Sequence, residues 1–376
     1  MIPFNKPYIT GREELYIKDC LEKGHIHGDG QYTKKINKFI EEKFNTKKAL
    51  MTTSCSSALD IAGILMDLKE GDEVIMPSFT FVSTANAVVL RGARPVFAEI
   101  NEDTLNIDPR DIENKITNHT KAIFPVHYAG VSCDMESIMN IAKKYNLIVV
   151  EDAAQGVNAK YKGKHLGTIG DIGCYSFHET KNYSSGEGGA ILINYDNDLS
   201  KRAETIREKG TNRSQFFRGE VDKYTWVDEG SSYLPADILA AFLWAQFEKL
   251  NKIQEMRKKV YDSYHFELEI LDKQGKLKLP IIPECCESNY HIFYILLNSE
   301  KERDNLMYKL KEKGIGAVFH YIPLHESTMG QKFGYKLGDF RITEELSKRI
   351  LRLPMYPELK TQQIEYIVKN IKYILH

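Results

Sequence analysis

Short apolar runs alternate with segments of helical periodicity along the first two-thirds of the chain. The runs at residues 48–52, 73–77, 95–100, 122–126 and 147–150 predict strands. The segments 54–68, 80–90 and 135–145 predict helices. Because strands and helices alternate and several strands are apolar throughout, we predict an α/β fold with a parallel or mixed sheet covered on both faces.

The pattern changes toward the C-terminus. A further strand is predicted at 189–193, followed by one long helix over 237–264 with an apolar face. From about residue 274, predicted strands at 277–279, 291–297 and 317–321 mix with predicted helices at 301–313 and 343–351. We therefore expect a large domain over residues 1–250, whose segment 1–35 lines the substrate cleft, and a small α+β domain over residues 251–376.

Composition narrows the class of protein. Hydrophobic residues make up 42% of the 376 residues, charged residues 27%, and the net charge is -1, which gives no electrostatic case for nucleic acid or an anionic membrane. The longest apolar runs are too short to span a bilayer, and the N-terminus lacks the apolar core of a signal peptide. The six cysteines form no CxxC pair, so we expect reduced thiols and a cytoplasmic protein. The adjacent Cys285 and Cys286 are compatible with a redox pair, although such neighbours in a polar loop are more often incidental.

The strongest chemical signal is a lysine that follows a short polar turn. Lys181 lies in the run Ser-Phe-His-Glu-Thr-Lys-Asn at 176–182, which continues into Gly-Glu-Gly-Gly at 186–189. Asp152 closes an apolar run further upstream. A lysine amine near a carboxylate at the end of a buried strand suits pyridoxal phosphate (PLP), because the amine can form a Schiff base and the carboxylate keeps the pyridine nitrogen protonated. Taken alone, Lys181 is typical of a surface lysine, and only the pairing favours the cofactor.

Other segments fit the same cofactor if they meet at the carboxyl ends of the strands. The run Thr-Thr-Ser-Cys-Ser-Ser at 52–57 follows a strand and opens a helix, so its hydroxyl and N–H groups suit a phosphate. Simple capping of the helix is the alternative for this run. Phe81 follows the next strand and suits stacking on an aromatic ring, with core packing as its alternative.

Competing motifs are weak. The glycines within 167–173 have the wrong spacing for a dinucleotide fingerprint, and the chain contains no P-loop. His25 and His27 lie close in sequence but lack further candidate ligands, so we predict no metal site.

With these motifs in place, the chain resembles the sugar-nucleotide aminotransferases, which are fold type I PLP enzymes that aminate keto-sugars attached to a nucleoside diphosphate. The resemblance covers essentially the whole chain and is carried by the runs at 72–81, 151–155 and 176–182. Further runs at 207–217, 230–235 and 318–325 resemble the members that form TDP-4-amino-4,6-dideoxygalactose. The resemblance implies a large domain with a mostly parallel, seven-stranded type of sheet and a small C-terminal α+β domain.

The resemblance also implies roles for individual residues. Lys181 corresponds to the Schiff-base lysine that also moves the proton, and Asp152 to the partner of the pyridine nitrogen. Further implied cofactor contacts are Phe81 on the ring, Gln155 beside the ring hydroxyl, and Ser56, Ser57 and Ser176 at the phosphate.

One departure from the family concerns the contact across a dimer. Many members carry an asparagine that reaches the cofactor phosphate of the neighbouring subunit, whereas here Ser232 stands in that run, which puts the contact in doubt. The family implies a homodimer or larger homo-oligomer with a shared active site.

Candidate substrate contacts are Lys209, Asn212, Arg213, His320 and Tyr321. For His320, an ordinary histidine hydrogen-bonded within the small domain is an equal alternative.

The implied reaction is a ping-pong transamination through pyridoxamine phosphate, with L-glutamate as donor and TDP-4-keto-6-deoxy-D-glucose as acceptor. Amination at C3 and formation of the gluco epimer stay open, because no spacing rule reports which face of the sugar meets the cofactor. A PLP-dependent sugar dehydratase is a further alternative, although relatives with that chemistry carry histidine where this chain has Lys181. A cofactor-binding protein without catalytic turnover is the third kind of function that stays open, after the aminotransferase and the dehydratase.

Overall fold

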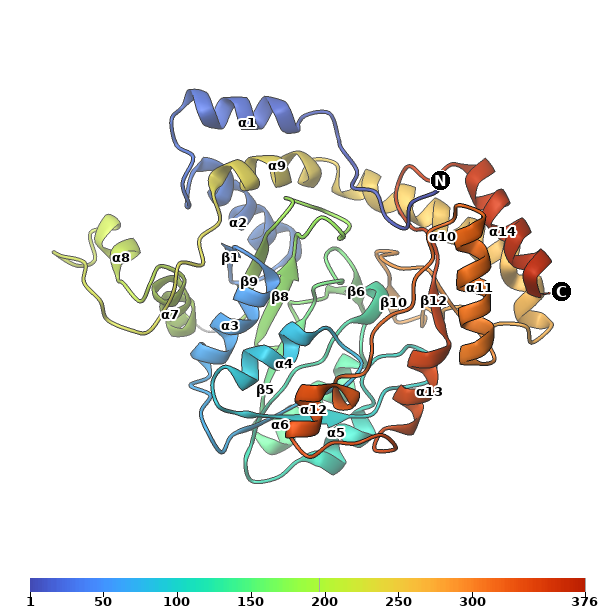
Figure 1. Cartoon of the computed structure of the whole chain (residues 1–376). Coiled ribbons are helices and arrows are strands. Elements are labelled where there is room, and N and C mark those ends of the chain that lie inside the picture. Colours follow the sequence, from blue (N-terminus) through green and yellow to red (C-terminus); the bar gives the residue numbers. More distant parts are fainter. Residues whose placement is uncertain (196, 376) are drawn as a thin grey trace.

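A seven-stranded sheet forms the centre of the large domain. The computed structural model describes residues 1–195 and 197–375 and places the strands in the order β1-β9-β8-β5-β4-β2-β3. Their bounds are Lys48–Thr52 (β1), Gly189–Ile193 (β9), Ile172–Ser176 (β8), Ile148–Asp152 (β5), Thr120–Ile123 (β4), Glu73–Pro77 (β2) and Arg94–Ala98 (β3). Only β9 pairs antiparallel with its two neighbours, so the predicted mostly parallel sheet is confirmed (Figure 1).

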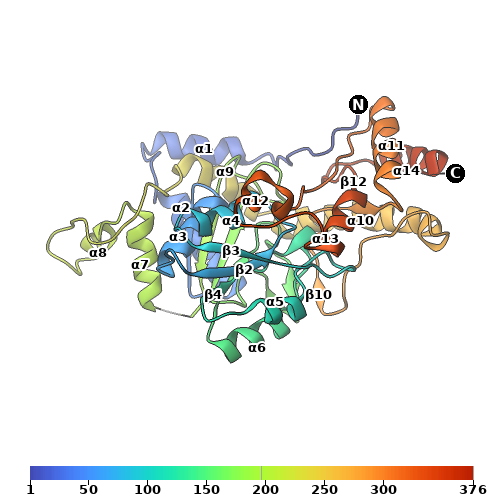
Figure 2. The same ribbon diagram turned by 60° about the horizontal axis from the view of Figure 1, so that its bottom comes forward.

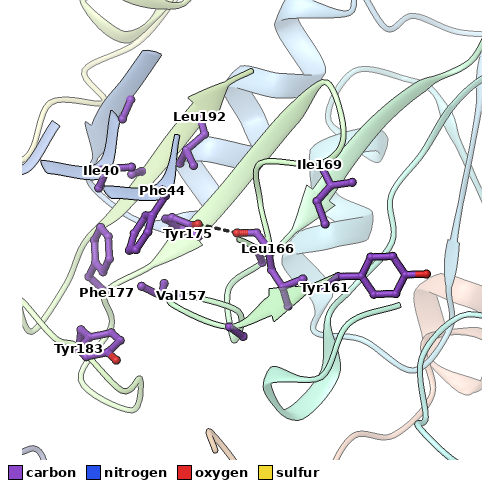
Figure 3. Packing of buried hydrophobic residues seen from close by; sticks show 14 of the residues in the cluster. Ile40, Phe44, Val157, Tyr161, Leu166, Ile169, Tyr175, Phe177, Tyr183 and Leu192 are labelled. Atoms are coloured by element: carbon purple, nitrogen blue, oxygen red, sulfur yellow. Dashed lines mark hydrogen bonds between the residues drawn. The ribbon is translucent and has the colours of Figure 1, made fainter. Parts of the chain in front are cut away.

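Helices cover both faces of this sheet, which explains why its strands are apolar throughout. Successive side chains of one strand enter different cores: Leu50 packs with α3 (Cys55–Leu65), whereas Met51 packs with α2 (Gln31–Phe44). Figure 3 shows part of the core that contains Met51 and α2, where Phe44 of α2 lies against Tyr175 of β8. The hydroxyl of Tyr175 donates a 2.5 Å hydrogen bond to the carbonyl oxygen of Leu166, so this buried polar atom is satisfied.

The other helices around the sheet follow the chain order. They are α4 (Val82–Val89), α5 (Pro109–Lys115), α6 (Met135–Tyr145), α7 (Asn197–Arg207) and the short α8 (Arg213–Phe217). Small elements complete this part: η1 (Tyr128–Gly130), β6 (Lys160–Tyr161) and β7 (Lys164–His165), the last two forming a small sheet with β10 (Cys286–Glu287). Figure 2 shows the segment around α8 extending away from the rest of the chain.

The predicted helix over 237–264 is wrong in one respect, because the chain forms two helices there. α9 (Asp237–Phe247) packs against α1 (Glu13–Glu22) and α2, and α10 (Leu250–Lys273) continues into the C-terminal part. Lys249 separates the two helices, because its backbone angles, φ -114° and ψ 17°, are not helical. Glu248 and Lys249, which lie between the two helices, are good helix formers, so local propensity does not account for the break. The buried carboxylate of Asp237 caps α2 by accepting hydrogen bonds from the backbone N–H groups of Tyr32 and Thr33.

The C-terminal part has its own apolar core. Its elements are α11 (Glu300–Glu312), η2 (Leu324–Glu326), α12 (Thr328–Lys332), α13 (Arg341–Arg349) and α14 (Thr361–Leu375), with β11 (Tyr294–Leu296) paired to β12 (Ile350–Arg352). Side chains of α10, α11, α14 and both strands share one hydrophobic cluster. This separate core supports the proposed division of the chain at about residue 250.

Three predictions for this part need correction. The predicted strands 277–279 and 317–321 reduce to the isolated bridges Lys278–Leu296 and Val318–Arg352. Pro280 limits the first, since proline cannot donate to a ladder; the second leaves the sheet as residues 320 and 321 turn into a cavity. The predicted helix 343–351 ends at Arg349, and the chain then turns into β12.

Among the described residues, no helix is long and apolar enough to cross a membrane.

Candidate active site

A cavity of about 510 Å³ opens at the carboxyl ends of the parallel strands, next to the C-terminal domain. Parallel sheets bind ligands at this edge, because the loops that leave the strands diverge there. Predicted site residues among its lining are Ser56, Phe81, Asp152, Gln155, Ser176, Lys181, His320 and Tyr321. The N-terminal segment contributes Phe4 and Asn5, and the C-terminal part contributes His291 and Arg352.

Asp152 ends β5 and is only 5% exposed. One carboxylate oxygen, Oδ2, accepts a 2.7 Å hydrogen bond from the hydroxyl of Thr84, and Oδ1 accepts one of 3.1 Å from the backbone N–H of Ala154. The two bonds fix the carboxylate in one orientation toward the cavity. A buried carboxylate held in this way can pair with a cationic ring nitrogen.

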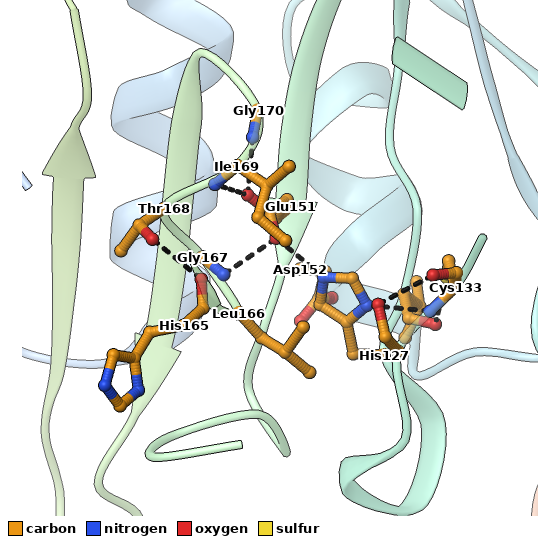
Figure 4. Close-up of polar contacts among 12 residues, drawn as sticks. His127, Cys133, Glu151, Asp152, His165, Leu166, Gly167, Thr168, Ile169 and Gly170 are labelled. Atoms are coloured by element: carbon orange, nitrogen blue, oxygen red, sulfur yellow. Dashed lines mark hydrogen bonds and ion pairs between the residues drawn. The ribbon is translucent and has the colours of Figure 1, made fainter. Parts of the chain in front are cut away.

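Glu151, the residue before Asp152, faces the other side of β5 and connects this strand to the neighbouring loops. Glu151 is fully buried and accepts hydrogen bonds from the N–H groups of Gly167, Ile169 and Gly170, and from Nε2 of His127 at 2.8 Å. Figure 4 shows these groups converging on Glu151 while Asp152 points elsewhere. The glycine-rich segment around 167–170 thus binds a carboxylate of its own chain, in agreement with the rejection of a dinucleotide motif.

Lys181 lies in a loop anchored on both sides. The N–H of Phe177 donates to the carbonyl of Gly188, and both Phe177 and Tyr183 are buried in the core. Between these anchors, the backbone N–H of Lys181 donates a 2.9 Å bond to the carbonyl of His178, and the side chain lines the cavity. Within the described residues, Nζ has no hydrogen-bond or ion-pair partner.

The surroundings change the acidity of this lysine. Burial, which disfavours the charged ammonium, is the main reason why the pKa of Lys181 is lowered, and the charge of Arg352 acts in the same direction. Cys55 and Asp152 oppose the shift without cancelling it. A lowered pKa increases the neutral fraction of the amine, the form that acts as nucleophile and base.

The N-terminus of α3 forms part of the cavity wall. Ser54 caps this helix by accepting a 3.0 Å hydrogen bond from the N–H of Ser57, and Ser56 exchanges a 2.6 Å bond with Ser83. Gly189 allows the close approach, because a Cβ there would lie 2.4 Å from the carbonyl carbon of Ser54. A helix N-terminus lined with hydroxyl groups is suited to a phosphate.

Aromatic side chains and one amide form another wall. The rings of His320 and Tyr321 lie 3.5 Å apart by their centroids, and the hydroxyl of Tyr128 is 2.8 Å from Nδ1 of His320. The side-chain amide of Gln155 donates to the hydroxyl of Tyr321 at 3.2 Å, and its oxygen accepts from the N–H of Ala129. Burial lowers the pKa of His320 well below its usual value, so its ring is neutral.

Five predicted residues do not line this cavity within the chain. Ser57 is engaged in the cap of α3, and Ser232 is exposed in the loop after α8. Arg213 pairs with Glu208 at 2.8 Å, and Asn212 accepts from the N–H of Thr225. The fifth, Lys209, is exposed near the same loop.

Some residues that line the cavity or hold its lining in place were not predicted from the sequence. Thr84 holds Asp152, and His291 shares a 2.8 Å hydrogen bond with the side chain of Asn182, the residue after the key lysine. Arg352 brings a cation. Only Asn182 carried a signal, because it belongs to the 176–182 run.

These groups fit PLP: a helix N-terminus for the phosphate, Phe81 and Tyr321 beside the ring space, a fixed carboxylate for the ring nitrogen, and a lysine of lowered pKa for the aldehyde. Together with the sheet, this site defines a fold type I PLP-dependent aminotransferase. Comparison with known proteins places it more narrowly. A sequence profile of the DegT/DnrJ/EryC1/StrS aminotransferase family matches residues 7–372, and the chain belongs to this family.

Individual relatives agree over nearly the whole chain. GDP-perosamine synthase of Escherichia coli O157:H7 is 34% identical over 372 residues, covering 98% of this chain and 97% of its own. The spore coat polysaccharide biosynthesis protein SpsC of Bacillus subtilis is 33% identical over 384 residues, covering 100% of this chain and 97% of its own. Among solved structures, the putative sugar aminotransferase Spr1654 of Streptococcus pneumoniae is 25% identical, and the match covers all of this chain. It superposes with a TM-score of 0.93 in its PMP form (99% of that chain covered) and 0.91 in its PLP form (98%).

Proposed function

We propose that this enzyme transfers the amino group of L-glutamate to the C4 keto group of TDP-4-keto-6-deoxy-D-glucose and forms TDP-4-amino-4,6-dideoxy-D-galactose. One observation carries the transamination: the amine of Lys181, whose pKa is lowered, lines the same cavity as the fixed carboxylate of Asp152. The choice of sugar is supported by the runs at 207–217, 230–235 and 318–325.

Within this reaction, bound PLP would supply the electron sink that stabilises negative charge beside the reacting carbon. Lys181 would hold the cofactor through Nζ and, once released by a substrate amine, would accept and return the proton at that carbon. Asp152 would keep the ring nitrogen protonated, with Thr84 fixing its carboxylate. The N-terminus of α3, with Ser56 and the nearby Ser176, would hold the phosphate.

The proposed sugar contacts fall into two groups. His320 and Tyr321 line the cavity directly, so a substrate that reaches Lys181 would pass them. Lys209, Asn212, Arg213 and Ser232 belong to the segment between α7 and α9 that includes α8, and we assign them to the active site of a partner subunit in a homodimer. Ser232 would then replace the asparagine that other members use at the partner's phosphate.

The nucleotide and the aminated carbon are inferred from the resemblance of the runs at 207–217, 230–235 and 318–325. One relative is named for a GDP-linked sugar, so family membership does not select thymidine. Amination at C3, or production of the gluco epimer, is the nearest alternative. A sugar dehydratase is disfavoured by the lysine at 181.

The test is a product analysis with purified protein, PLP and L-glutamate, offering TDP-4-keto-6-deoxy-D-glucose and its GDP-linked counterpart in parallel. We expect an amino sugar from the TDP substrate, with C4 substitution and galacto configuration in its NMR couplings. A C3 product would correct the regiochemistry, and a gluco product would correct the configuration at C4. Consumption of the sugar without glutamate, and without nitrogen in the product, would replace the proposal by the dehydratase.

A further inference from the structure

A chain of three buried side chains joins the end of β2 to the C-terminal part. Ser78, the residue after β2, and His325 of η2 are both fully buried, and the hydroxyl of Ser78 lies 2.7 Å from Nδ1 of His325. The other ring nitrogen, Nε2, lies 3.0 Å from a carboxylate oxygen of Glu344 on α13. The N–H of His325 also donates to the hydroxyl oxygen of Ser78 at 3.1 Å, and the N–H of Leu324 donates to its carbonyl at 2.9 Å. One short segment therefore holds Ser78 by three hydrogen bonds.

The carboxylate of Glu344 fixes the direction of these hydrogen bonds. A carboxylate can only accept, so the proton of the His325 ring is on Nε2 and points to Glu344. Nδ1 is then the acceptor, and the hydroxyl of Ser78 donates to it. The backbone N–H groups of Gly338 and Phe340 donate to the same oxygen of Glu344. Burial acts to raise the pKa of Glu344, but the hydrogen bonds outweigh it and the pKa is lowered, so the carboxylate stays charged.

The chain has the order of groups found in serine hydrolases, but it does not act on a substrate. Ser78 is fully buried and does not line the cavity, so its hydroxyl is out of reach of a bound molecule. A metal ion between His325, Glu326 and Glu344 would have to displace a hydrogen bond, because both ring nitrogens of His325 are engaged. The three side chains therefore act on the position of the segments that they join.

These two segments carry aromatic walls of the ring space in the cavity. Phe81 lies three residues after Ser78, and Tyr321 lies four residues before His325. The centroids of the Phe81 and Tyr321 rings are 6.4 Å apart, and both side chains line the cavity. Phe81 is 58% exposed, so core packing does not fix its ring and its place depends on the backbone of its loop. The contact between Ser78 and His325 thus sets how far apart the two walls stand.

We propose that His325 is a positioning residue for the cofactor, because through Ser78 it fixes the separation of Phe81 and Tyr321, beside which the ring of PLP would bind. This inference rests on the cofactor site of the proposed function. The C-terminal part would thereby hold one wall of a site whose lysine and carboxylate belong to the large domain, without touching the cofactor through His325 itself. Loss of the contact would release the loop at 78–81 and leave the ring face less firmly supported.

The test combines a titration of apoprotein with PLP and the visible circular dichroism of the bound cofactor. Ser78→Ala should weaken PLP affinity about 5- to 10-fold, the effect of one lost hydrogen bond, and lower the circular dichroism per bound cofactor. His325→Phe keeps a ring but removes both nitrogens, and should weaken binding further. Glu344→Gln keeps an acceptor for His325 without the charge, and should lie between wild type and Ser78→Ala. The matched control, Ser347→Ala, removes another buried hydroxyl from α13 and should lower the melting temperature without changing either cofactor readout.

A double-mutant cycle determines whether Ser78 acts through the aromatic wall. In a Phe81→Leu background, Ser78→Ala should weaken PLP binding by less than about 2-fold, because the wall that it positions is already lost. An equal loss in both backgrounds would overturn the assignment, and so would equal effects of Ser78→Ala and Ser347→Ala on PLP binding. Wild-type binding and circular dichroism in both Ser78→Ala and Glu344→Gln would overturn it as well. Failure of the wild type to transaminate would instead count against the proposed function, while PLP binding would still test His325.

Discussion

The hydroxyl of Thr84 donates a 2.7 Å hydrogen bond to Oδ2 of Asp152, joining the first turn of α4 to the end of β5. Thr84 also shares a hydrogen bond of 2.8 Å with the hydroxyl of Thr80, so the two threonines and Asp152 form a chain of hydrogen bonds. Both threonines are buried. The carboxylate proposed for the ring nitrogen is thus oriented by a helix distant in sequence.

Replacing Thr84 by valine keeps the shape of the side chain and removes this hydrogen bond. Bonds to charged groups contribute about 1.5–3 kcal/mol, so we expect PLP affinity to fall roughly 10-fold or more. A titration of apoprotein with PLP, followed by absorbance, measures it. Thr80→Val, which leaves the bond to Asp152 intact, is the matched control and should have the smaller effect; equal effects would show that Thr84 does not act through Asp152.

Removal of the lysine amine should abolish transamination. In Lys181→Ala the nucleophile and the proton carrier are lost together, so product formation should fall below detection while PLP still binds through the phosphate end and Asp152. Turnover by liquid chromatography and PLP content by absorbance check the two halves of this statement. Activity near the wild-type level would contradict the role of Lys181.

Asp152→Asn is nearly isosteric and removes only the negative charge. We expect the melting temperature to stay within a few degrees of wild type, whereas the rate should drop at least 100-fold because the ring nitrogen loses its anionic partner. Calorimetry and steady-state kinetics measure the two effects. A rate close to that of wild type would show that the ring nitrogen lies elsewhere.

The acidity of Lys181 predicts a pH profile for capture of PLP by the apoprotein. The reaction needs the neutral amine, so its rate should rise with pH and level off above the pKa of Lys181. Burial and Arg352 lower that pKa, so the midpoint should lie below the ordinary 10.5. Arg352→Gln removes one lowering influence and should move the midpoint upward. Stopped-flow absorbance measures both profiles, and a wild-type midpoint at or above 10.5 would be inconsistent with this environment.

The exposed aromatic side chains around α8 predict a subunit contact. Phe217, Tyr224 and Trp226 are 69%, 51% and 77% exposed on a segment that extends from the rest of the chain in Figures 1 and 2. If this segment meets a second copy, Trp226→Asp should weaken dimerisation at least 10-fold by light scattering over a concentration series. Tyr373→Asp, at a 79% exposed position on α14, should leave it unchanged. Wild-type association in the Trp226 variant would exclude this contact.

The central sheet could be predicted because burial on both faces makes its strands apolar throughout, as Leu50 and Met51 illustrate. β8 escaped prediction because it contains Gly173. A Cβ at that position would lie 2.0 Å from the carbonyl oxygen of Gly167, so close backbone approach selects glycine in a strand where composition argues against it. The helices α1, α2 and α14 were also not predicted.

For the site, local sequence was sufficient to bring Asp152 and Lys181 to one cavity, because each closes or follows a recognisable segment. It was insufficient for Thr84, which contacts Asp152, and for His291 and Arg352, which line the cavity, because only the packing of separate elements brings them to the site. Arg352 in particular follows a predicted helix, and its role depends on the chain turning into β12 instead.

The most direct test of the account is the visible absorption spectrum of the purified protein with PLP, recorded before and after L-glutamate and again after TDP-4-keto-6-deoxy-D-glucose. We predict that glutamate removes the visible band of the lysine-bound cofactor and that the keto-sugar restores it, because the two half-reactions share one site. A band that does not respond to glutamate, or one that the sugar fails to restore, would contradict the proposed transamination.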